Sequence, residues 1–582
     1  MTAFLNIETS LSGRRWIGPD TNRDRAALTL AQQANVPPLL ASVLARIGVE
    51  TEDVPSYLAP TLKELMPDPS TLLDMDKAAE IFWHAAKSQK KIAIFADYDV
   101  DGGSSAALLI SWLTDLGHQA TLYVPDRIDE GYGPNDIAMT KLGKSHDLIV
   151  CVDCGTLAHG PIEAAKKAGA EVIVLDHHQG GETLPNAAAV VNPNRQDEES
   201  PLTYLCAAGV VFMMLVAVNR LMRQSGQTGP NLPNLLDLVA LATVADVAPL
   251  QGLNRAFVRQ GLKIMANRAR PGLTALADVA KVTSMPNTYH LGYLLGPRIN
   301  AGGRIGKADM GARLLATNSE HEAAALAEKL DALNRERRQI EAQVLDAALM
   351  QAEGRGLDAP LVWAADQNWH PGVVGIVAAR LKEAANRPAV VIGFEDGLGK
   401  GSGRSVEGID LGSNVAILTR EGLFEKGGGH KMAAGLTVRE EKLEAAMERL
   451  TDLLGKQGAG QLGPRNLRID GALDPQGATI EMIEKLEEAG PFGANAPAPR
   501  IALPSQKIAF AKEVGEGHLS LTLDMPGPKL KVMAFGAFKS DIGPALSAHK
   551  GARFHLAGKL EIDDWGGQRK AKLKLDDAAP VS

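Results

Sequence analysis

The segment from Phe95 to Leu109, FADYDVDGGSSAALL, carries aspartates at positions 97, 99 and 101, followed by two glycines. Asp-x-Asp-x-Asp-Gly also opens an EF-hand calcium loop, whose twelfth residue is a bidentate glutamate. The twelfth residue here is Leu108, and the preceding run KIAIFA has the pattern of a buried strand rather than a helix. Helical apolar spacing follows the glycines. The three carboxylates therefore indicate a ligand site where a strand turns into a helix, and not a calcium loop.

Further acidic residues stand at comparable positions. Asp153 follows the apolar run LIVCV, Asp176 follows VIVL and precedes two histidines, and Asp246 lies in LATVADVAPL, which we predict to be an apolar helix. A single aspartate at a strand end is usually a helix cap or a turn former. Aspartates follow three predicted strands, at Asp97, Asp153 and Asp176, and the last begins the sequence Asp-His-His. Three independent caps explain this pattern poorly. Crowded buried carboxylates repel one another unless cations neutralise them, and oxygen ligands with one or two imidazoles suit Mn²⁺ or Mg²⁺ better than Zn²⁺.

The pattern of apolar runs predicts an α/β protein of several domains. The runs KIAIFAD, ATLYVPD, DLIVCVD, EVIVLD and AAAVVN alternate with helical segments, as in a parallel sheet covered on both faces. Ser319 and Glu322 form a predicted capping box at the start of a long amphipathic helix. We expect a helical lead-in at 1–88, a strand–helix domain with a helical extension at 89–316, a connecting helix at 317–353, a second α/β domain at 354–458 and a small antiparallel barrel, an OB-fold, at 465–582.

Composition narrows the classes of protein. A chain of 582 residues exceeds the size of a single core, and 45% apolar with 22% charged residues is typical of a soluble protein. The longest uncharged run, Leu205 to Val218, is too short to span a bilayer, and the first residues lack the layout of a signal peptide. We therefore expect a cytoplasmic protein without membrane contact. The net charge of −8 argues against a diffuse basic coat but leaves room for a local basic channel.

Two other motifs are disfavoured. Cys151 and Cys154 form a lone CxxC, which lacks the second ligand pair of a zinc site and the fold of a redox protein. The stretch GGGH ending at His430 lacks the Lys-Ser/Thr of a P-loop and the spacing of a dinucleotide fingerprint, so ATP and NAD are unexpected.

Several motifs together resemble a known family. DYDVDG, VDCG, DHH and TVADVAPL occur in the order found in the DHH phosphoesterases. RINAGGRIG, HPGVVGIVAARL, SGRS and GGGHKMAAG are similar to the RecJ branch, which comprises bacterial single-strand-DNA-specific 5′→3′ exonucleases. The resemblance covers nearly the whole chain. In the segment PFGANAPAPR, Asn495, Ala496 and Ala498 replace the Gly, Asn and Glu that are usual in the family.

The resemblance implies a set of metal ligands and a mechanism. Two divalent ions, Mn²⁺ or Mg²⁺, would activate a water molecule for in-line attack on a phosphodiester and release a 5′-mononucleotide. Asp153 would bridge the two ions, Asp176 would orient its neighbouring histidine, and His178 would face the scissile phosphate. The implied ligands are Asp97, Asp99, Asp101, Asp153, His177 and Asp246.

The resemblance also implies a substrate track. Arginine pairs bidentately with phosphate, and SGRS is interpreted as a Gly-rich turn that brings backbone amides near an anion. Arg127, Ser402 and Arg404 would form a 5′-phosphate pocket. Other candidate contacts in the matched motifs are Arg298, Asn300, Arg304, Arg380, Ser405, Gly428, Gly429 and His430.

Two lobes facing each other across the long helix would make a groove too narrow for duplex DNA, which explains single-strand specificity. The barrel would extend this track. It has few aromatic residues, so we expect electrostatic contact there more than stacking; they are Phe510, Phe535, Phe538, Phe554 and Trp565. Single-strand-binding protein and a RecQ-type helicase are implied partners, and we expect a monomer.

Two other kinds of protein share part of this pattern. A DHH phosphodiesterase for short oligonucleotides or cyclic dinucleotides would share the metal motifs, but such enzymes are typically shorter and lack the barrel. A non-catalytic binding protein related to this family would have lost metal ligands, whereas every expected ligand is present here.

Overall fold

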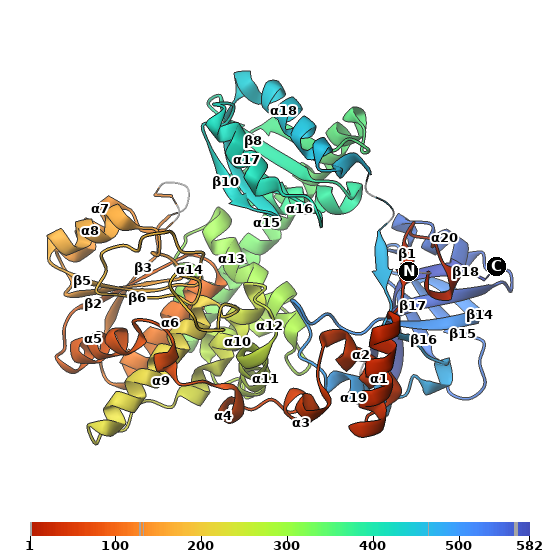
Figure 1. Ribbon diagram of the computed structural model, residues 1–582, viewed down its shortest axis with the longest axis horizontal. Helices are drawn as coiled ribbons and strands as arrows, with labels where there is room; N and C mark the ends of the chain where they lie inside the picture. Colours follow the sequence, from red (N-terminus) through yellow and green to blue (C-terminus); the bar gives the residue numbers. More distant parts are fainter. Residues whose placement is uncertain are drawn as a thin grey trace.

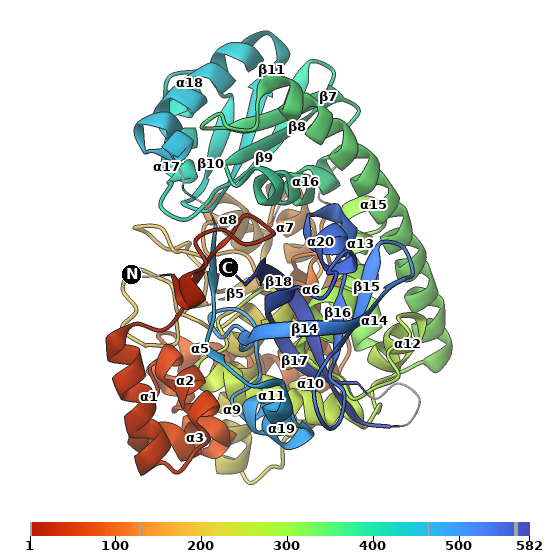
Figure 2. The same cartoon turned by 90° about the vertical axis from the view of Figure 1, so that its right-hand side faces the viewer.

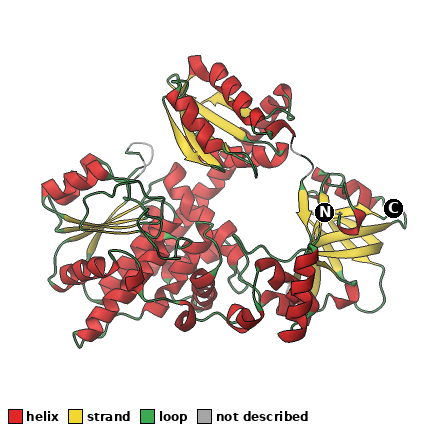
Figure 3. Cartoon of the chain, in the orientation of Figure 1, coloured by secondary structure: helices red, strands yellow, loops and turns green. Residues whose placement is uncertain are grey.

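The computed structural model describes residues 3–126, 130, 131, 133–461, 463, 465–563 and 568–581. The chain forms three lobes: a strand–helix lobe, a second α/β lobe reached by a long helix, and a β-barrel beside the N-terminal helices (Figure 1). Both chain ends lie at the barrel lobe. Colouring by secondary structure shows one sheet in each of the first two lobes and the barrel in the third (Figure 3).

The first lobe contains a five-stranded parallel sheet, as the sequence predicts. Ala96 pairs with Val152, and Val152 pairs with Leu175, so the residues that follow these strands emerge side by side at one edge. In spatial order the strands are β3 (Ala120–Tyr123), β2 (Ile92–Ala96), β4 (Leu148–Val152), β5 (Glu171–Leu175) and β6 (Ala189–Val191). From β2 the chain crosses to β3 on one side of the sheet and then to β4 on the other side. This reversal creates a topological switch point, where α/β proteins bind ligands.

Helices cover both faces of this sheet. Ile94 and Ala96 pack into one core with α5 (Met75–Lys87), α6 (Val100–Asp115) and α9 (Ala207–Gln224). Ala93 and Phe95 pack into another core with α7 (Asp136–Gly143) and α8 (His159–Ala168). Burial of alternate residues on opposite faces explains why this strand reads as a continuous apolar run.

Helix α9 is long and apolar enough, by length and composition, to cross a membrane. Two thirds of it (67%) is buried inside the protein, where Val211 and Leu215 pack in the core of the first lobe. Helix α9 is therefore a core helix of the first lobe.

The first lobe continues as a layer of helices and joins the second lobe through α15 (Glu320–Arg355). At 1.5 Å per residue this helix is about 54 Å long. Leu326 and Leu330 pack in the first lobe, whereas Val344 and Ala348 pack in the second, so the predicted connector is confirmed. The helices before it are α10 (Leu236–Ala245), α11 (Gly252–Ala266), α12 (Pro271–Val279), the π-helix η5 (His290–Leu295), α13 (Gly296–Ile305) and α14 (Met310–Ala316).

The second lobe has a mixed five-stranded sheet, with α15 and α16 (Pro371–Ala385) on one face and α17 (Leu411–Arg420) and α18 (Leu443–Lys456) on the other. The SGRS segment is not a turn: Ser402 to Arg404 end a strand. A Cβ on Gly403 would lie 2.6 Å from the Leu411 side chain, so packing explains this glycine. The strand order is β10 (Lys426–His430), β11 (Ala433–Arg439), β9 (Leu398–Arg404), β8 (Ala389–Glu395) and β7 (Val362–Gln367).

The third lobe is a closed five-stranded barrel with the OB-fold order that the sequence predicts. Strand β17 pairs with β14 and closes the barrel. Most pairs are antiparallel, but β16 and β18 pair in parallel, which corrects the expectation of a purely antiparallel barrel. Its elements are β14 (Ile501–Val514), β15 (His518–Leu523), β16 (Lys531–Ala534), α20 (Ile542–Ser547), β17 (Arg553–Asp563) and β18 (Lys570–Pro580).

The N-terminal segment is shared between two lobes. Strand β1 (Arg15–Ile17) pairs with β12 (Asn466–Arg468), and α1 (Thr21–Gln33) and α2 (Pro38–Ile47) pack around α19 (Ile480–Glu487), next to the barrel (Figure 2). The buried Trp16 Nε1 donates a hydrogen bond to Asp577 Oδ2 at 2.9 Å. The later helix α5 belongs to the core of the first lobe.

Candidate metal centre

The first three aspartates lie in the turn between β2 and α6. Asp99 caps α6, because its Oδ1 accepts hydrogen bonds from the backbone N–H groups of Asp101 (2.8 Å) and Gly102 (3.1 Å). A Cβ at Gly102 would lie 2.4 Å from the carbonyl oxygen of Asp97. Only glycine therefore permits this close approach, which holds the buried Asp97 and Asp101 beside the sheet edge.

Asp101 is anchored by a helix that the motif itself does not contain. Its carboxylate accepts hydrogen bonds from the backbone N–H groups of Ala207 (2.7 Å) and Ala208 (2.8 Å) at the start of α9. The N-terminal end of a helix favours negative charge. Burial nevertheless raises the pKa of Asp101 above its ordinary value, against the opposing charge of His177.

Asp153 has a strained backbone and an unsatisfied side chain. It follows β4 with φ of +59°, in the left-handed region that costs a non-glycine residue about 1 kcal/mol or more and that occurs often at functional sites. Its Oδ1 lies 3.2 Å from His177 Nε2 but accepts no hydrogen bond from the residues that the structure describes. The same nitrogen of His177 lies 3.6 Å from Asp101 Oδ2 and 3.8 Å from Asp246 Oδ2.

Asp246 is not inside a helix, in contrast to the sequence-based expectation. Helix α10 ends at Ala245, and Asp246 is its C-cap, with a side chain that is 26% exposed. Val247 follows with φ of +59°, so the chain turns sharply at this point. The turn brings the carboxylate out of the helical layer and towards the sheet edge.

Asp176 orients His178. Its Oδ1 accepts hydrogen bonds from the His178 Nδ1 (2.7 Å) and from the backbone N–H of His177 (2.8 Å), and its Oδ2 accepts from the Thr156 hydroxyl (2.7 Å). Burial alone would raise the pKa of Asp176, but hydrogen bonds from His178 and Thr156 hold it below its ordinary value. Burial alone would lower the pKa of His178, but Asp176 raises it to about 9. His178 is therefore a cation at neutral pH in the metal-free protein.

Three supporting residues were missed by the sequence analysis. Thr156 hydrogen-bonds to Asp176, and Asn192 Nδ2 donates to both the Thr156 hydroxyl and the His178 carbonyl, each at 2.8 Å. Asn194 Nδ2 donates to the His177 carbonyl at 2.6 Å. The only local signal was the position of VVNPN at the end of the last strand.

The acidic side chains form overlapping groups of possible metal ligands. Within each group the ligand atoms lie within 4.8 Å of one another, and Asp153 and His177 each belong to two groups. Burial and the neighbouring carboxylates raise the pKa of Asp153 well above its ordinary value and that of Asp246 to about 8. Divalent cations would remove this repulsion, so the donor set fits Mn²⁺ or Mg²⁺. The groups are Asp97, Asp99 and Asp153; Asp101, His177 and Asp246; and Asp153, His177 and His178.

The cysteines of the CxxC motif do not contribute ligands to these groups. Cys151, Cys154 and Cys206 are buried and free. Burial raises the pKa of all three thiols, so they remain protonated and behave as small apolar residues.

A cluster of arginines lies where α13, α15 and the second lobe meet. Arg404 Nη1 donates to Ser402 Oγ at 2.8 Å, and a Cβ on Gly375 would lie 3.2 Å from Arg404 Nη2. Burial and the charge of Arg304 lower the pKa of Arg404. Among the described residues neither Arg304 nor Arg404 forms an ion pair with a carboxylate. Two partly buried guanidinium groups without a carboxylate partner among the described residues have the chemistry to bind an anion.

Arg337 on α15 extends this cluster and was missed by the sequence analysis. It is 8% exposed, and burial lowers its pKa, with a further contribution from Arg304. It pairs with Glu341 at 2.9 Å, one turn along the same helix. Its signal in the sequence, one charge among many on a long helix, is indistinguishable from a surface ion pair.

Other predicted substrate contacts have structural partners. Arg298 forms a partly buried ion pair with Asp331 on α15 at 2.9 Å, and Asn300 Oδ1 accepts from the backbone N–H of Val100 at 3.0 Å. These contacts fix α13 against the connecting helix and against the turn that carries Asp97, Asp99 and Asp101.

The side chains of two more candidates are engaged by other partners. Arg380 is exposed and pairs with Glu383 at 3.0 Å on the surface of α16. Ser405 is buried, and its hydroxyl donates to the Ile409 carbonyl at 2.8 Å. Arg127 lies outside the described residues.

Gly428, Gly429 and His430 lie in β10, which is an edge strand of the second sheet. A Cβ on Gly429, whose φ is +152°, would lie 2.3 Å from the Ala433 carbonyl oxygen, whereas a Cβ on Gly428 would meet no atom within 4 Å. His430 is exposed. The space beside Gly428 at this sheet edge is therefore open, and a ligand can approach the backbone closely there.

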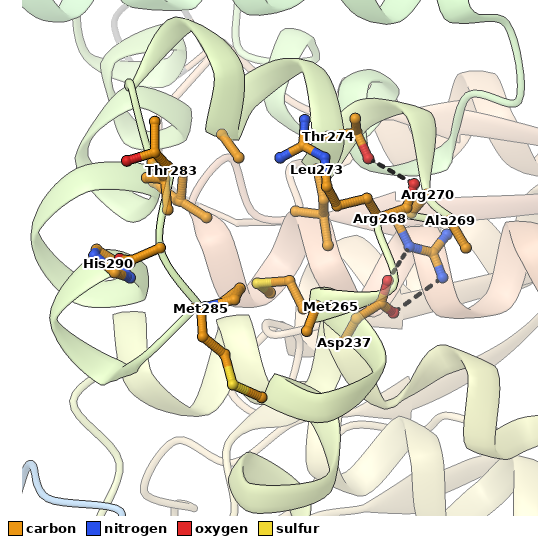
Figure 4. Close-up of a pocket in the computed structure, with 16 residues that line it drawn as sticks. Asp237, Met265, Arg268, Ala269, Arg270, Leu273, Thr274, Thr283, Met285 and His290 are labelled. Atoms are coloured by element: carbon orange, nitrogen blue, oxygen red, sulfur yellow. Dashed lines mark hydrogen bonds and ion pairs between the residues drawn. The ribbon is translucent and has the colours of Figure 1, made fainter. Parts of the chain in front are cut away.

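A pocket of about 330 Å³ lies apart from the metal centre, among the helices of the first lobe (Figure 4). Its lining is largely apolar, with Met265, Leu273 and Met285. Arg270 at its wall donates two hydrogen bonds, of 2.8 and 3.1 Å, to Asp237, so the two charges neutralise each other. The pocket contains none of the metal-binding groups.

Comparison with known proteins follows the three lobes. Residues 91–243 match the DHH family, N-terminal domain; residues 358–456 match the DHHA1 domain; and residues 469–577 match the RecJ OB domain. The parallel sheet with its acidic edge and the lobe beyond the long helix therefore define a DHH-family protein.

Relatives identify the branch. The chain is 36% identical to the single-stranded-DNA-specific exonuclease RecJ of Escherichia coli over 94% of this chain and 97% of that protein. It is 31% identical to that of Bacillus subtilis, over 98% of this chain and 71% of the relative. The crystal structure of RecJ in complex with Mn²⁺ from Thermus thermophilus superimposes with a TM-score of 0.79 and 28% identity, over 97% of this chain and 80% of that one. The chain belongs to the RecJ family.

Proposed function

We propose that this protein is a single-stranded-DNA-specific exonuclease that hydrolyses phosphodiester bonds with two divalent cations, Mn²⁺ or Mg²⁺. The observation that carries the proposal is the shared position of Asp153, whose carboxylate belongs to two groups of ligand atoms at the sheet edge. Full-length similarity to RecJ, including the barrel, disfavours a phosphodiesterase for dinucleotides.

The side chains have distinct proposed roles. When bound, the two ions would supply an activated water and neutralise the phosphate oxygens. Asp97, Asp99, Asp101, Asp153, His177 and Asp246 would hold the two ions, and Asp153 is common to two of the ligand groups. Asp176 engages Nδ1 of His178 and so orients the ring, whose imidazolium stabilises charge on the scissile phosphate or protonates the leaving oxygen.

The arginine cluster gives the reaction its direction. Arg404, Ser402 and Arg304, together with Arg127, bind the 5′-terminal phosphate, and Arg337 adds positive charge from α15. Paired guanidinium groups suit a terminal phosphate, which carries more charge than an internal one. The enzyme therefore acts 5′→3′ and releases 5′-mononucleotides, each cleavage exposing the next 5′-phosphate.

We propose a division of labour between the units. Residues 89–316 bind the metals, residues 354–458 bind the 5′ end, and residues 465–582 bind the strand, with 317–353 as the connector and 1–88 as a lead-in. The narrow track excludes duplex DNA. A cytoplasmic monomer acting in DNA recombination and repair, with single-strand-binding protein and a RecQ-type helicase as partners, fits this activity.

The test uses a 5′-phosphorylated single strand of about 30 nucleotides, long enough to reach an OB-fold site, labelled at either end. With Mn²⁺, immediate release of 5′-labelled mononucleotide, a slowly shortening 3′-labelled ladder and an intact blunt duplex support the proposal. Cleavage of a dinucleotide but not of the long strand would contradict it.

A further inference from the structure

Two exposed tyrosines stack on each other next to the barrel. Tyr289 is 53% and Tyr293 71% exposed, and their ring centroids lie 5.3 Å apart with planes inclined by 23°. Tyr289 immediately precedes the π-helix η5, and Tyr293 lies within it. Residues four apart share one face of a helix, and π-helical turns are rare and frequent at functional sites.

The barrel presents its own exposed aromatic residue opposite this pair. Phe535 follows β16 and is 54% exposed; its ring centroid lies 5.3 Å from that of His518, at an angle of 69°. The backbone N–H of Gly536 donates to His518 Nδ1 at 3.0 Å and fixes that ring. Of the other barrel aromatics, Phe510 (60%) and Phe538 (39%) are also exposed, Phe554 is buried, and Trp565 lies outside the described residues.

Lys574 joins the two sides. Its Nζ lies 5.7 Å from the ring centroid of Tyr289 and 5.7 Å from that of Phe535, within cation–π distance of both. It also lies 4.0 Å from Glu561, a loose pairing. We name this group of Tyr289, Tyr293, His518, Phe535 and Lys574 the aromatic bridge.

The barrel side of the aromatic bridge lies on the nucleic-acid face typical of OB-folds. Lys574 pairs with Met533 on β16, and Met533 pairs with Ser520 on β15, so their side chains share the outer face of the second, third and fifth barrel strands. Alternate residues such as Leu519 and Val532 are buried inside. The face formed by the second and third strands is the one that OB-folds use for oligonucleotides.

The helix that carries the tyrosines rests on the turn of a metal ligand. A Cβ on Gly292 would lie 3.4 Å from Val244, and a Cβ on Gly296 would lie 3.2 Å from Ala245. These two residues directly precede Asp246. The helix that carries the tyrosines therefore packs against the residues that precede Asp246, while Lys574 and Phe535 of the aromatic bridge belong to the barrel.

We propose that the aromatic bridge is a base-stacking site for the single strand on the 3′ side of the scissile bond, formed jointly by the first lobe and the barrel. This proposal rests on the proposed exonuclease function. Every base has a π-face, so such a site binds any sequence, while Lys574 adds a cation next to the stacked rings. The position of the aromatic bridge explains how a barrel with few aromatic residues can bind bases by stacking, because the first lobe contributes Tyr289 and Tyr293.

The test measures binding of 5′-phosphorylated oligo(dT) of about 20 nucleotides, in an Asp153→Asn background that prevents cleavage. Tyr289→Ala/Tyr293→Ala is expected to raise the Kd about 5- to 100-fold, the usual effect of losing base stacking. Tyr289→Phe/Tyr293→Phe keeps the rings and restores binding to within about twofold. Ile137→Ala, which removes an exposed apolar side chain on α7 (84% exposed), is the matched control.

Two further readouts separate stacking from charge. The alanine pair leaves the slope of log Kd against log salt unchanged, because no phosphate contact is lost, whereas Lys574→Ala reduces it. On an oligonucleotide with abasic residues the alanine pair binds as tightly as wild type. Phe535→Ala tests the same site from the barrel, which keeps the proposal falsifiable if the tyrosine variants fold poorly.

Normal binding of oligo(dT) by both the tyrosine and the Phe535 variants would overturn the stacking site while leaving the exonuclease proposal intact. Equal losses on abasic and ordinary strands would also overturn it. Failure of the wild-type protein to bind or cleave any single strand would instead overturn the proposed function, and the aromatic bridge with it.

Discussion

His177 Nε2 lies 3.2 Å from Asp153 Oδ1, an oxygen that accepts no hydrogen bond from the described residues. The two side chains come from neighbouring strand ends and each belongs to two groups of possible ligands. A buried carboxylate oxygen without a donor is unfavourable in water-excluded surroundings, unless a cation takes the place of the donor. The arrangement is therefore one that bound metal completes.

Asp153→Ala is expected to reduce hydrolysis of single-stranded DNA by more than about 100-fold, since even partners of metal ligands contribute 10- to 100-fold. Binding of the strand in the absence of metal should remain near wild type, because the arginine cluster and the barrel are untouched. Single-turnover cleavage and fluorescence anisotropy measure the two effects. Asp115→Ala, at an exposed position on α6, is the control; wild-type cleavage by Asp153→Ala would refute the metal centre.

Metal-free protein should lose stability as the pH rises. Burial, with the charges of Asp101 and Asp99, raises the pKa of Asp246 from 3.8 to about 8. The folded state then binds more protons than the unfolded state between these values, so the free energy of unfolding falls as pH increases through that range. Mn²⁺ binds the ionised carboxylate and should raise the Tm more at pH 8 than at pH 6.

Thermal unfolding with EDTA and with Mn²⁺, each across this pH range, measures the effect. Asp246→Asn cannot ionise and should flatten part of the pH dependence of the metal-free protein. An identical pH dependence in wild type and Asp246→Asn would show that this carboxyl does not contribute.

The positions of the candidate metal ligands could be predicted because their signal is local. An apolar run, an aspartate and a helical pattern follow one another within a few residues at Asp97 and Asp153, and parallel strands bring such ends together. The supporting contacts have no local signal. Asp101 meets the backbone of Ala207 and Ala208 across more than a hundred residues, and Trp16 meets Asp577 across nearly the whole chain.

The SGRS segment shows a different limit. Glycine in a short polar motif is typical of a turn, yet Gly401 and Gly403 lie in β9, where Ile392, Leu436 and Leu411 occupy the space that a Cβ would need. Tertiary packing, which the sequence does not display, decides between a turn and a strand.

The predicted capping box at the start of α15 is only half formed. Ser319 caps the helix as predicted, but the Glu322 carboxylate accepts a hydrogen bond from Thr317 instead of completing the box.

Thr156→Val should impair catalysis through the position of His178. The substitution removes the hydroxyl that donates to Asp176 and accepts from Asn192 Nδ2, leaving both buried groups short of a partner. We expect kcat to fall about 10- to 100-fold with little change in KM, and stability to fall by about 1–3 kcal/mol. Thr156→Ser keeps the hydroxyl and is the control. Equal kcat values for the two variants would exclude a positioning role.

Trp16→Phe should loosen the N-terminal segment from the barrel. Loss of the indole N–H leaves the fully buried Asp577 Oδ2 without its donor, at an expected cost of about 1–3 kcal/mol. Denaturant unfolding monitors the loss, and a double-mutant cycle with Asp577→Ala isolates the pair. Additive effects in that cycle would mean that the hydrogen bond does not couple the two segments.

Arg404→Ala should weaken the preference for a 5′-phosphorylated end. Arg404 lies beside Ser402, and the nearby charge of Arg304 makes a bound phosphate the natural counter-ion for both guanidinium groups. A hydrogen bond to a charged group contributes about 1.5–3 kcal/mol, so kcat/KM for a 5′-phosphorylated strand should fall about 10- to 100-fold. The value for a 5′-hydroxyl strand should change much less. Arg380→Ala, which removes an exposed arginine of the same lobe, is the matched control. Equal losses on both strands would place Arg404 outside the 5′-phosphate site and leave the direction of cleavage to be set by other residues.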